Sequence, residues 1–319
     1  MIMEVEFLIE GLDPSEYLIK VVTGFVKDCI KQSRVSESDI DKILLADDDN
    51  YLKAIKQLDE NETYTKNNMV VGMGKTIYRR NNNEYKNGIV LKRVIIEAPL
   101  EGNIKYKNID EWEPARLEFL YVIHHELGHC YDNKTRNLIE YPKIFDENKL
   151  FKIKQVAEYY TAILLSDFFA CVFSAYAARE KMIEYDCRNL DGYVIKGEKR
   201  IVDLKTKYFV DKNYLYELAF EVAGDFWFIL MQYAKLVGFK IGNEVLSSVE
   251  IKVDSDVINK NIDILREFEK ILNNCYKYYP NYDSKIHNFL FDIWNRLCLR
   301  CGYEFVEGLN SDALFFNIY

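Results

Sequence analysis

The chain has 319 residues, of which 49% are hydrophobic and 29% are charged, so it is long enough to bury a substantial core. Its formal net charge is −9, and its lysines are scattered among acids. Nucleic-acid-binding domains usually carry a clustered basic surface that neutralises phosphates, so the composition argues against a nucleic-acid partner. The length predicts one large domain or two modest ones.

The first hundred residues predict a mixture of helices and strands. Asp13 is a good N-cap and Pro14 fits the first helical position, so a helix is expected to run to about Lys31. Two short elements are expected after it, a strand over 41–48 and a helix over 50–58.

The next part of the chain predicts a β-hairpin. The segments 69–80 and 88–100 are rich in β-branched residues, and the tract "NNNEYKNG" (81–88) lies between them as the expected turn. The stretch "GMGKT" (72–76) inside the first segment is not a phosphate loop, because that motif would need a glycine where Met69 stands.

The rest of the chain predicts helices. One is expected after Pro114, and the pattern beyond about residue 182 is mostly helical, with a short extended segment at "GYVIKGEKRIVDL". The main helices are expected over 115–133, 155–180 and 283–301. The prediction is therefore a helix-rich α+β fold, with one domain over 1–180 and a helical C-terminal region over 181–319.

Two features bear on the compartment. The N-terminal "MIMEVEFLIEGLDP" does not resemble a secretory signal, and the seven cysteines suggest no disulfide framework. The apolar segments 159–178 and 218–239 are interrupted by acids, and a lone carboxylate inside a bilayer costs several kcal/mol. We expect buried core helices, no stable membrane insertion and a cytoplasmic location.

The segment "YVIHHELGHC" (121–130) holds three of the four histidines. His125 and His129 are one helical turn apart, so their rings can converge on one metal ion, and Glu126 lies at the edge of the same face. This H-E-x-x-H spacing is typical of zinc hydrolases, with two neutral nitrogen ligands and a carboxylate placed as general base. His124 lies about 100° around the helix and is expected to pack in the core or to support a ligand histidine, and not to bind the metal itself.

A catalytic zinc needs a third protein ligand. The metzincin pattern would need glycine and histidine where Asp132 and Thr135 stand, and the only other histidine is the distant His287. A carboxylate is therefore expected, and Asp167 is favoured because it stands among apolar residues in "LLSDFFAC".

Other acids remain alternatives to Asp167. Glu158 is on the same predicted helix but would point to nearly the opposite side, and Glu221 and Asp225 are more remote candidates. The mechanism expected from the motif uses zinc to activate a water, with Glu126 accepting its proton and passing it to the leaving amine. The donor that stabilises the oxyanion stays open among the 24 tyrosines and His287.

"HHELGHC" followed by an apolar helix with "SDFFAC" resembles the zincin metallopeptidases, most of all the ImmA/IrrE-type group. The resemblance covers roughly residues 88 to 180. It implies a small sheet packed on the H-E-x-x-H helix, zinc as cofactor, and a cytoplasmic endopeptidase that cleaves protein substrates such as regulators. That group usually has a glutamate ligand where Leu165 stands here, so either Asp167 substitutes for it or the alignment is shifted.

The resemblance also implies that "GIVLKRVIIEAP" forms a sheet edge that binds the substrate peptide, with plain sheet core as the alternative. Three rival functions stay open. They are a non-catalytic zinc-binding regulatory protein on a zincin scaffold, a zinc hydrolase acting on a non-peptide amide, and a membrane-associated peptidase.

Overall fold

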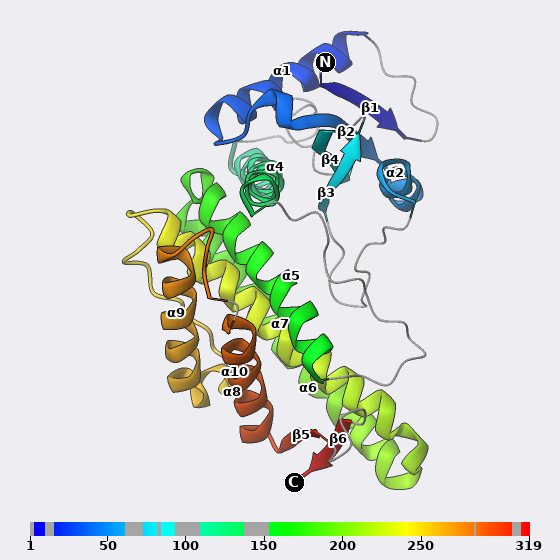
Figure 1. The fold of residues 1–319 in the computed structure, drawn as a ribbon, viewed down its shortest axis with the longest axis vertical. Helices are drawn as coiled ribbons and strands as arrows, with labels where there is room; N and C mark the ends of the chain where they lie inside the picture. The colour runs from blue at the N-terminus through cyan, green and yellow to red at the C-terminus, as the bar shows by residue number, and fades with distance from the viewer. Residues whose placement is uncertain are drawn as a thin grey trace. The chain divides into compact units, whose positions relative to one another are not determined.

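The structure is a computed structural model. It describes residues 3–9, 16–60, 73–81, 84–92, 109–136, 153–283, 285–307 and 314–319. The chain divides into two compact units (Figure 1). Unit 1 is Met1–Ile139 with Phe169–Ala178, and unit 2 is Glu140–Phe168 with Arg179–Tyr319. The division crosses a single helix, α5 (Ile153–Ser174), between Phe168 and Phe169.

Unit 1 contains a four-stranded mixed sheet in the order β1-β2-β4-β3. Its strands are β1 (Glu4–Leu8), β2 (Ile40–Ala46), β3 (Gly74–Asn81) and β4 (Glu84–Lys92). β2 is parallel to both β1 and β4, while β3 runs antiparallel to β4. In this register Ile89 of β4 is opposite Ile43 of β2 and Thr76 of β3.

Helices cover both faces of this sheet (Figure 1). α1 (Glu16–Gln32) and α4 (Ile109–Arg136) share one core with Ile43 and Leu45 of β2. α2 (Tyr51–Leu58) packs on the other face, around Leu44 and Ala46. The alternation along β2 follows from the two-residue repeat of a strand, and because both faces are covered its second half, Ile43–Ala46, is apolar without interruption.

The predicted hairpin is present, but its expected turn is wrong. β4 begins at Glu84, so most of the tract 81–88 is strand, paired in register with β3 up to Asn81–Glu84. Glu84 and Tyr85 are exposed while Asn87 is buried, and the polar composition of this tract resembles that of a turn. The described part of "GIVLKRVIIEAP" is also not an edge, because β4 pairs with strands on both sides. Its remaining residues lie outside the described ranges.

The H-E-x-x-H segment lies on α4, which starts before the predicted residue 115 and includes Pro114. α5 follows in the chain and ends in a short 3-10 turn over Ala175–Ala177. Within the described residues, Tyr159–Ala177 is long and apolar enough to cross a membrane, and 67% of that window is buried in the protein. Core helices of this length and composition pass the same test, so the observation is weak evidence for a membrane span.

Unit 2 is mostly helical. It contains α6 (Glu180–Val210), α7 (Leu215–Gly242), α8 (Asp256–Lys260), α9 (Ile262–Lys277), α10 (Ile286–Arg300) and a two-stranded sheet of β5 (Tyr303–Glu307) and β6 (Leu314–Ile318). At its core Trp227 of α7 stacks on Trp294 of α10, with ring centroids 5.4 Å apart. The helix-rich content and the small mixed sheet agree with the predicted α+β class.

The extended segment predicted over 192–204 is wrong, because these residues lie inside α6. The buried residues there recur at helical spacing, at Tyr193, Val194, Gly197, Ile201 and Leu204. Tyr193 and Val194, like Ile201 and Leu204, would lie on opposite faces of a strand, whereas they lie on one side of a helix, so the burial pattern follows the helical repeat.

Candidate metal centre

His125 and His129 face one another across one turn of α4. Their ring centroids are 4.7 Å apart, and the two Nε2 atoms are 3.1 Å apart. His125 is 8% exposed, so its ring is held inside the protein while one nitrogen still faces its partner. The sequence spacing of four residues produces this approach directly, since residues i and i+4 of a helix lie on one face.

Asp167 of α5 completes the group that the sequence predicts. One nitrogen from each of His125 and His129 and one carboxylate oxygen of Asp167 all lie within 4.8 Å of one another. This group could hold a metal ion. Two imidazole nitrogens and a carboxylate oxygen form a donor set that suits zinc and several other divalent transition metals.

Asp167 also has a cation beside it on α7. Its Oδ2 atom is 3.7 Å from Nζ of Lys235, and both side chains are mostly buried. The expected cost of a carboxylate in an apolar helix is therefore reduced by an ion pair even without a metal ion.

Glu126 is buried, and strand β3 fixes its carboxylate. The hydroxyl of Thr76 donates to Glu126 Oε2 at 2.7 Å and lies 3.1 Å from the Glu126 backbone oxygen. Gly74 lies two residues earlier on the same face of β3, and an ideal Cβ there would be 2.6 Å from Glu126 Oε1. The missing side chain of Gly74 provides the space in which the carboxylate sits.

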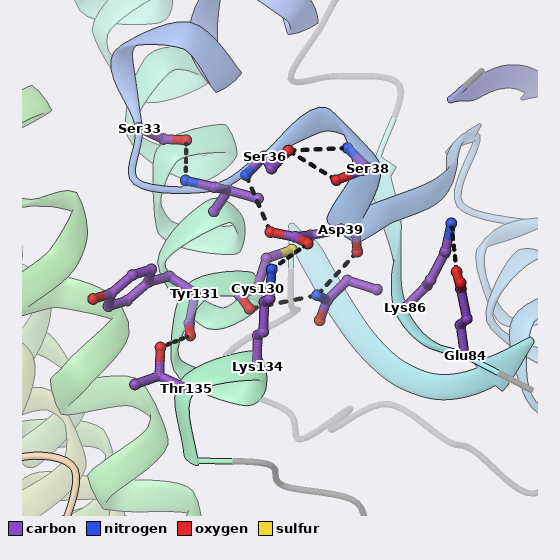
Figure 2. Close-up of polar contacts among 12 residues, drawn as sticks. Ser33, Ser36, Ser38, Asp39, Glu84, Lys86, Cys130, Tyr131, Lys134 and Thr135 are labelled. Carbon is purple, nitrogen blue, oxygen red and sulfur yellow. Dashed lines mark hydrogen bonds and ion pairs between the residues drawn. The ribbon is translucent and has the colours of Figure 1, made fainter. Parts of the chain in front are cut away.

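The end of the H-E-x-x-H segment is tied to the sheet through Asn87 of β4, which is fully buried. Its Nδ2 donates to the backbone oxygens of Cys130 and Asp39, and its Oδ1 accepts from Nδ2 of Asn133 at 3.2 Å. At the surface of the protein, Nζ of Lys134 donates to Oδ1 of Asp39 at 2.6 Å (Figure 2). These contacts fix the position of α4 against the sheet immediately after His129.

α4 and the C-terminal part of α5 pack very closely in unit 1. An ideal Cβ at Gly128 would overlap the backbone oxygen of Ala170, so only glycine fits at this crossing. One residue further along α5, Sγ of Cys171 is 3.5 Å from Nδ1 of His125. The crossing therefore brings a side chain of α5 against the ring nitrogen of His125 that faces away from His129.

His124 is separate from this group. It is 2% exposed, and its Nδ1 is 2.6 Å from the hydroxyl of Tyr176. Burial penalises the charged ring and lowers the pKa of His124 to about 4. Its position matches the packing residue expected from the sequence.

The other candidates have different partners. Nδ1 of His287 is 2.5 Å from the hydroxyl of Thr161 in unit 2. Asp225 accepts hydrogen bonds from Tyr193 and Arg200, and burial raises its pKa. Oε2 of Glu221 is 3.7 Å from Nε of the same Arg200, so both remote acids are beside a cation of unit 2. The side chain of Glu158 lies outside the described part of the structure.

Three site residues, Thr76, Gly74 and Cys171, are not predicted by the sequence pattern. Thr76 and Gly74 belong to "GMGKT", a segment that resembles part of a phosphate loop and has no pattern typical of a metal site. One sequence feature could have pointed to Gly74 and Thr76. A glycine and a hydroxyl residue two positions apart on a strand lie on the same face, where they leave room for a polar side chain and can bond to it. Their contact with Glu126 depends on how the sheet meets α4, which the sequence pattern does not specify.

The chain matches no known protein family, no curated protein and no solved structure.

Proposed function

We propose that the chain is a zinc-dependent endopeptidase of the zincin type. The observation that supports this best is that ligand atoms of His125, His129 and Asp167 lie within 4.8 Å of one another. The two histidines lie on α4, the helix that also carries Glu126. The resemblance of "HHELGHC" and "SDFFAC" to the ImmA/IrrE-type group adds zinc as the metal, the cytoplasm as the location and a protein, such as a regulator, as the substrate.

In this proposal the metal ligands would be Nε2 of both histidines and a carboxylate oxygen of Asp167. Bound zinc would supply Lewis-acid chemistry, lowering the pKa of a water and polarising a carbonyl. Glu126 would accept a proton on its carboxylate and deliver it to the leaving amine. Thr76 would hold Oε2 in place, leaving Oε1 as the oxygen that moves the proton.

Strand β3 is the element that would bind the substrate. Within the described ranges it pairs with β4 on one side only, and Thr76 and Gly74 on this strand contact Glu126. A peptide added as a further strand along this edge would form backbone hydrogen bonds close to the general base. This replaces β4, which the sequence suggested for the same role.

The test compares wild type with Glu126→Gln. We expect both proteins to hold about one zinc per chain, and only wild type to cleave labelled casein or proteins of a cell extract. Glu37→Gln changes an exposed glutamate paired with Lys27 and should leave cleavage intact. The proposal fails if purified wild type takes up no metal, or if Glu126→Gln cleaves as fast as wild type.

A non-catalytic regulatory protein on the same scaffold is the second candidate. The ion pair between Asp167 and Lys235 favours it, because that pair offsets the charge of the carboxylate without zinc. Under this alternative the Lys235→Met variant would lose stability and no substrate would be cleaved by any variant. Under the peptidase proposal Lys235→Met retains zinc and still cleaves substrate.

A further inference from the structure

Helix α5 presents two polar side chains on one face, one turn apart. Asp167 belongs to the candidate metal group, and Cys171 follows four residues later. Cys171 is fully buried, and its Sγ is 3.5 Å from Nδ1 of His125, within the range of a sulfur hydrogen bond.

The two nitrogens of the His125 ring have different neighbours. Nε2 faces Nε2 of His129 at 3.1 Å, whereas Nδ1 faces the sulfur of Cys171. A metal shared by the two histidines would therefore be bound through Nε2, because that is the nitrogen that each ring turns toward the other.

A neutral histidine ring carries one proton, so the contact with Cys171 has two forms. In one form the thiol donates to Nδ1, the ring proton is on Nε2, and Nε2 has no lone pair for a metal. In the other form Nδ1–H donates to the sulfur, and the lone pair of Nε2 is free. Only the second form is compatible with coordination.

We propose that Cys171 is a positioning residue for the metal centre, whose sulfur accepts a hydrogen bond from Nδ1–H of His125. This inference rests on the proposed function, in which His125 is a ligand. Partners of this kind orient a ligand histidine and fix its tautomer, and their removal commonly costs 10-fold to 100-fold in metal affinity. A carboxylate often has this role, and sulfur is a weaker acceptor.

The first test measures zinc affinity by competition with a chromophoric chelator. We expect Cys171→Ala to weaken zinc binding at least about tenfold and Cys171→Ser to stay within about threefold of wild type, because a hydroxyl can also accept the bond. Cys29→Ala is the matched control, since Cys29 is a 3% exposed cysteine in the core of the same unit and far along the chain from the ligands. It should bind zinc as wild type does.

The second test separates positioning from plain packing. In zinc-loaded protein with ¹⁵N-labelled histidine, we expect His125 to show a protonated Nδ1 and a metal-bound Nε2. Cys171→Ser should shift the Nδ1 resonance of His125 and leave that of His129 in place. A purely structural cysteine would lower stability without this selective shift, and the measurement on wild type alone decides the tautomer if Cys171→Ala does not fold.

Three results have distinct meanings. If wild type binds zinc and cleaves substrate, but Cys171→Ala matches Cys29→Ala in zinc affinity, the role of Cys171 is refuted and the peptidase proposal stands. An Nδ1 of His125 without a proton in the zinc-loaded protein also refutes it. If wild type binds no zinc, both proposals fall together.

Discussion

Gly128, inside the H-E-x-x-H motif, sets how closely α4 approaches α5. An added methyl group would overlap the backbone oxygen of Ala170, and neither backbone can move without shifting its helix. We expect Gly128→Ala to lower the free energy of unfolding by about 1–3 kcal/mol, the usual range for overpacking. Urea denaturation of the metal-free protein measures this.

The control for that change is Gly24→Ala in α1. Nothing lies within 4 Å of an ideal Cβ at Gly24, which is in the middle of a helix of the same unit. Removing a flexible glycine there should raise stability by about 0.5–1 kcal/mol. Equal effects of the two substitutions would show that the close crossing at Gly128 carries no steric constraint.

Thr76 provides a prediction about catalysis. Its hydroxyl donates to Glu126 Oε2 at 2.7 Å, so Thr76→Val removes a donor without changing the shape of the side chain much. If Glu126 is the general base, kcat should fall about tenfold, a part of the 10²–10⁴ that general base catalysis contributes, while zinc content stays unchanged.

Thr76→Ser is the matched variant, because it keeps the hydroxyl and should retain most of the rate. Steady-state kinetics on a peptide substrate separate kcat from KM. A fall in kcat that is equal for valine and serine would contradict the role of the hydrogen bond, because serine keeps the hydroxyl that valine lacks.

At this scale the sequence predicts local geometry well and contacts between distant elements poorly. A single turn of α4 places His125, Glu126 and His129 next to one another. Asp167 is predicted among several acids because its neighbours in the sequence are apolar. Thr76 and Cys171 reach the site from elements 50 and 46 residues away along the chain. No local sequence pattern predicts contacts between residues so far apart along the chain.

Among the elements, the connection between β4 and α4 depends on one buried amide. Asn87 bonds to the backbone of Cys130 and to Asn133, and none of these groups can turn to solvent. We expect Asn87→Ala to destabilise the protein by about 2 kcal/mol, because it leaves buried polar groups without partners. Chemical denaturation measures the change.

The comparison variant is Lys134→Ala, which breaks a contact of the same α4 turn with Asp39 on the surface. The Lys134 side chain is 57% exposed, and pairs of this kind are worth about 0–1 kcal/mol. A larger loss for Lys134→Ala than for Asn87→Ala would mean that α4 is held from the surface and not from the core.

In unit 2, α9 and α10 are joined by a pair whose strength depends on pH. The two terminal nitrogens of the Arg300 guanidinium, Nη1 and Nη2, donate to the carboxylate of Asp263 at 2.5 and 2.6 Å. These hydrogen bonds lower the pKa of Asp263 to about 2. A lowered carboxyl pKa stabilises the folded state above the unfolded value of about 3.9 and loses that contribution as the pH falls toward 2.

We therefore expect wild type to be more stable than Asp263→Asn at pH 7, with the difference disappearing near pH 2. The effect should be small and should shrink in high salt, since both side chains are largely exposed. Arg300→Lys keeps the charge but not the paired bonds, so it should fall between the two. A difference that stays constant from pH 7 to pH 2 contradicts this assignment.

Elements with a strong repeat were predictable, while their ends were not. α1, α2, α10 and the hairpin lie close to their predicted ranges. The turn at 81–88 and the extended segment at 192–204 are wrong, because asparagine-rich strand ends look like turns and β-branched residues also occur in long helices. Tertiary packing decides such cases, and it is not visible in a local window.

For the whole molecule, a metal bound only by the folded chain ties stability to metal concentration. The unfolded chain does not bring His125, His129 and Asp167 together, so zinc binding favours the folded state. Stability should rise by about 2.7 kcal/mol when free zinc is 100 times its dissociation constant, and a chelator should remove the gain.

His287 offers a control for this effect within the same molecule. Its ring bonds to Thr161 and does not belong to the metal group, so His287→Ala should still gain stability with zinc, from a lower starting point. His125→Ala should lose the zinc response altogether, since one of three ligands is gone. Thermal unfolding of the three proteins, each with zinc and with chelator, tests this. A zinc response that survives in His125→Ala places the bound metal elsewhere on the chain, and its absence in wild type contradicts a metal centre at His125, His129 and Asp167.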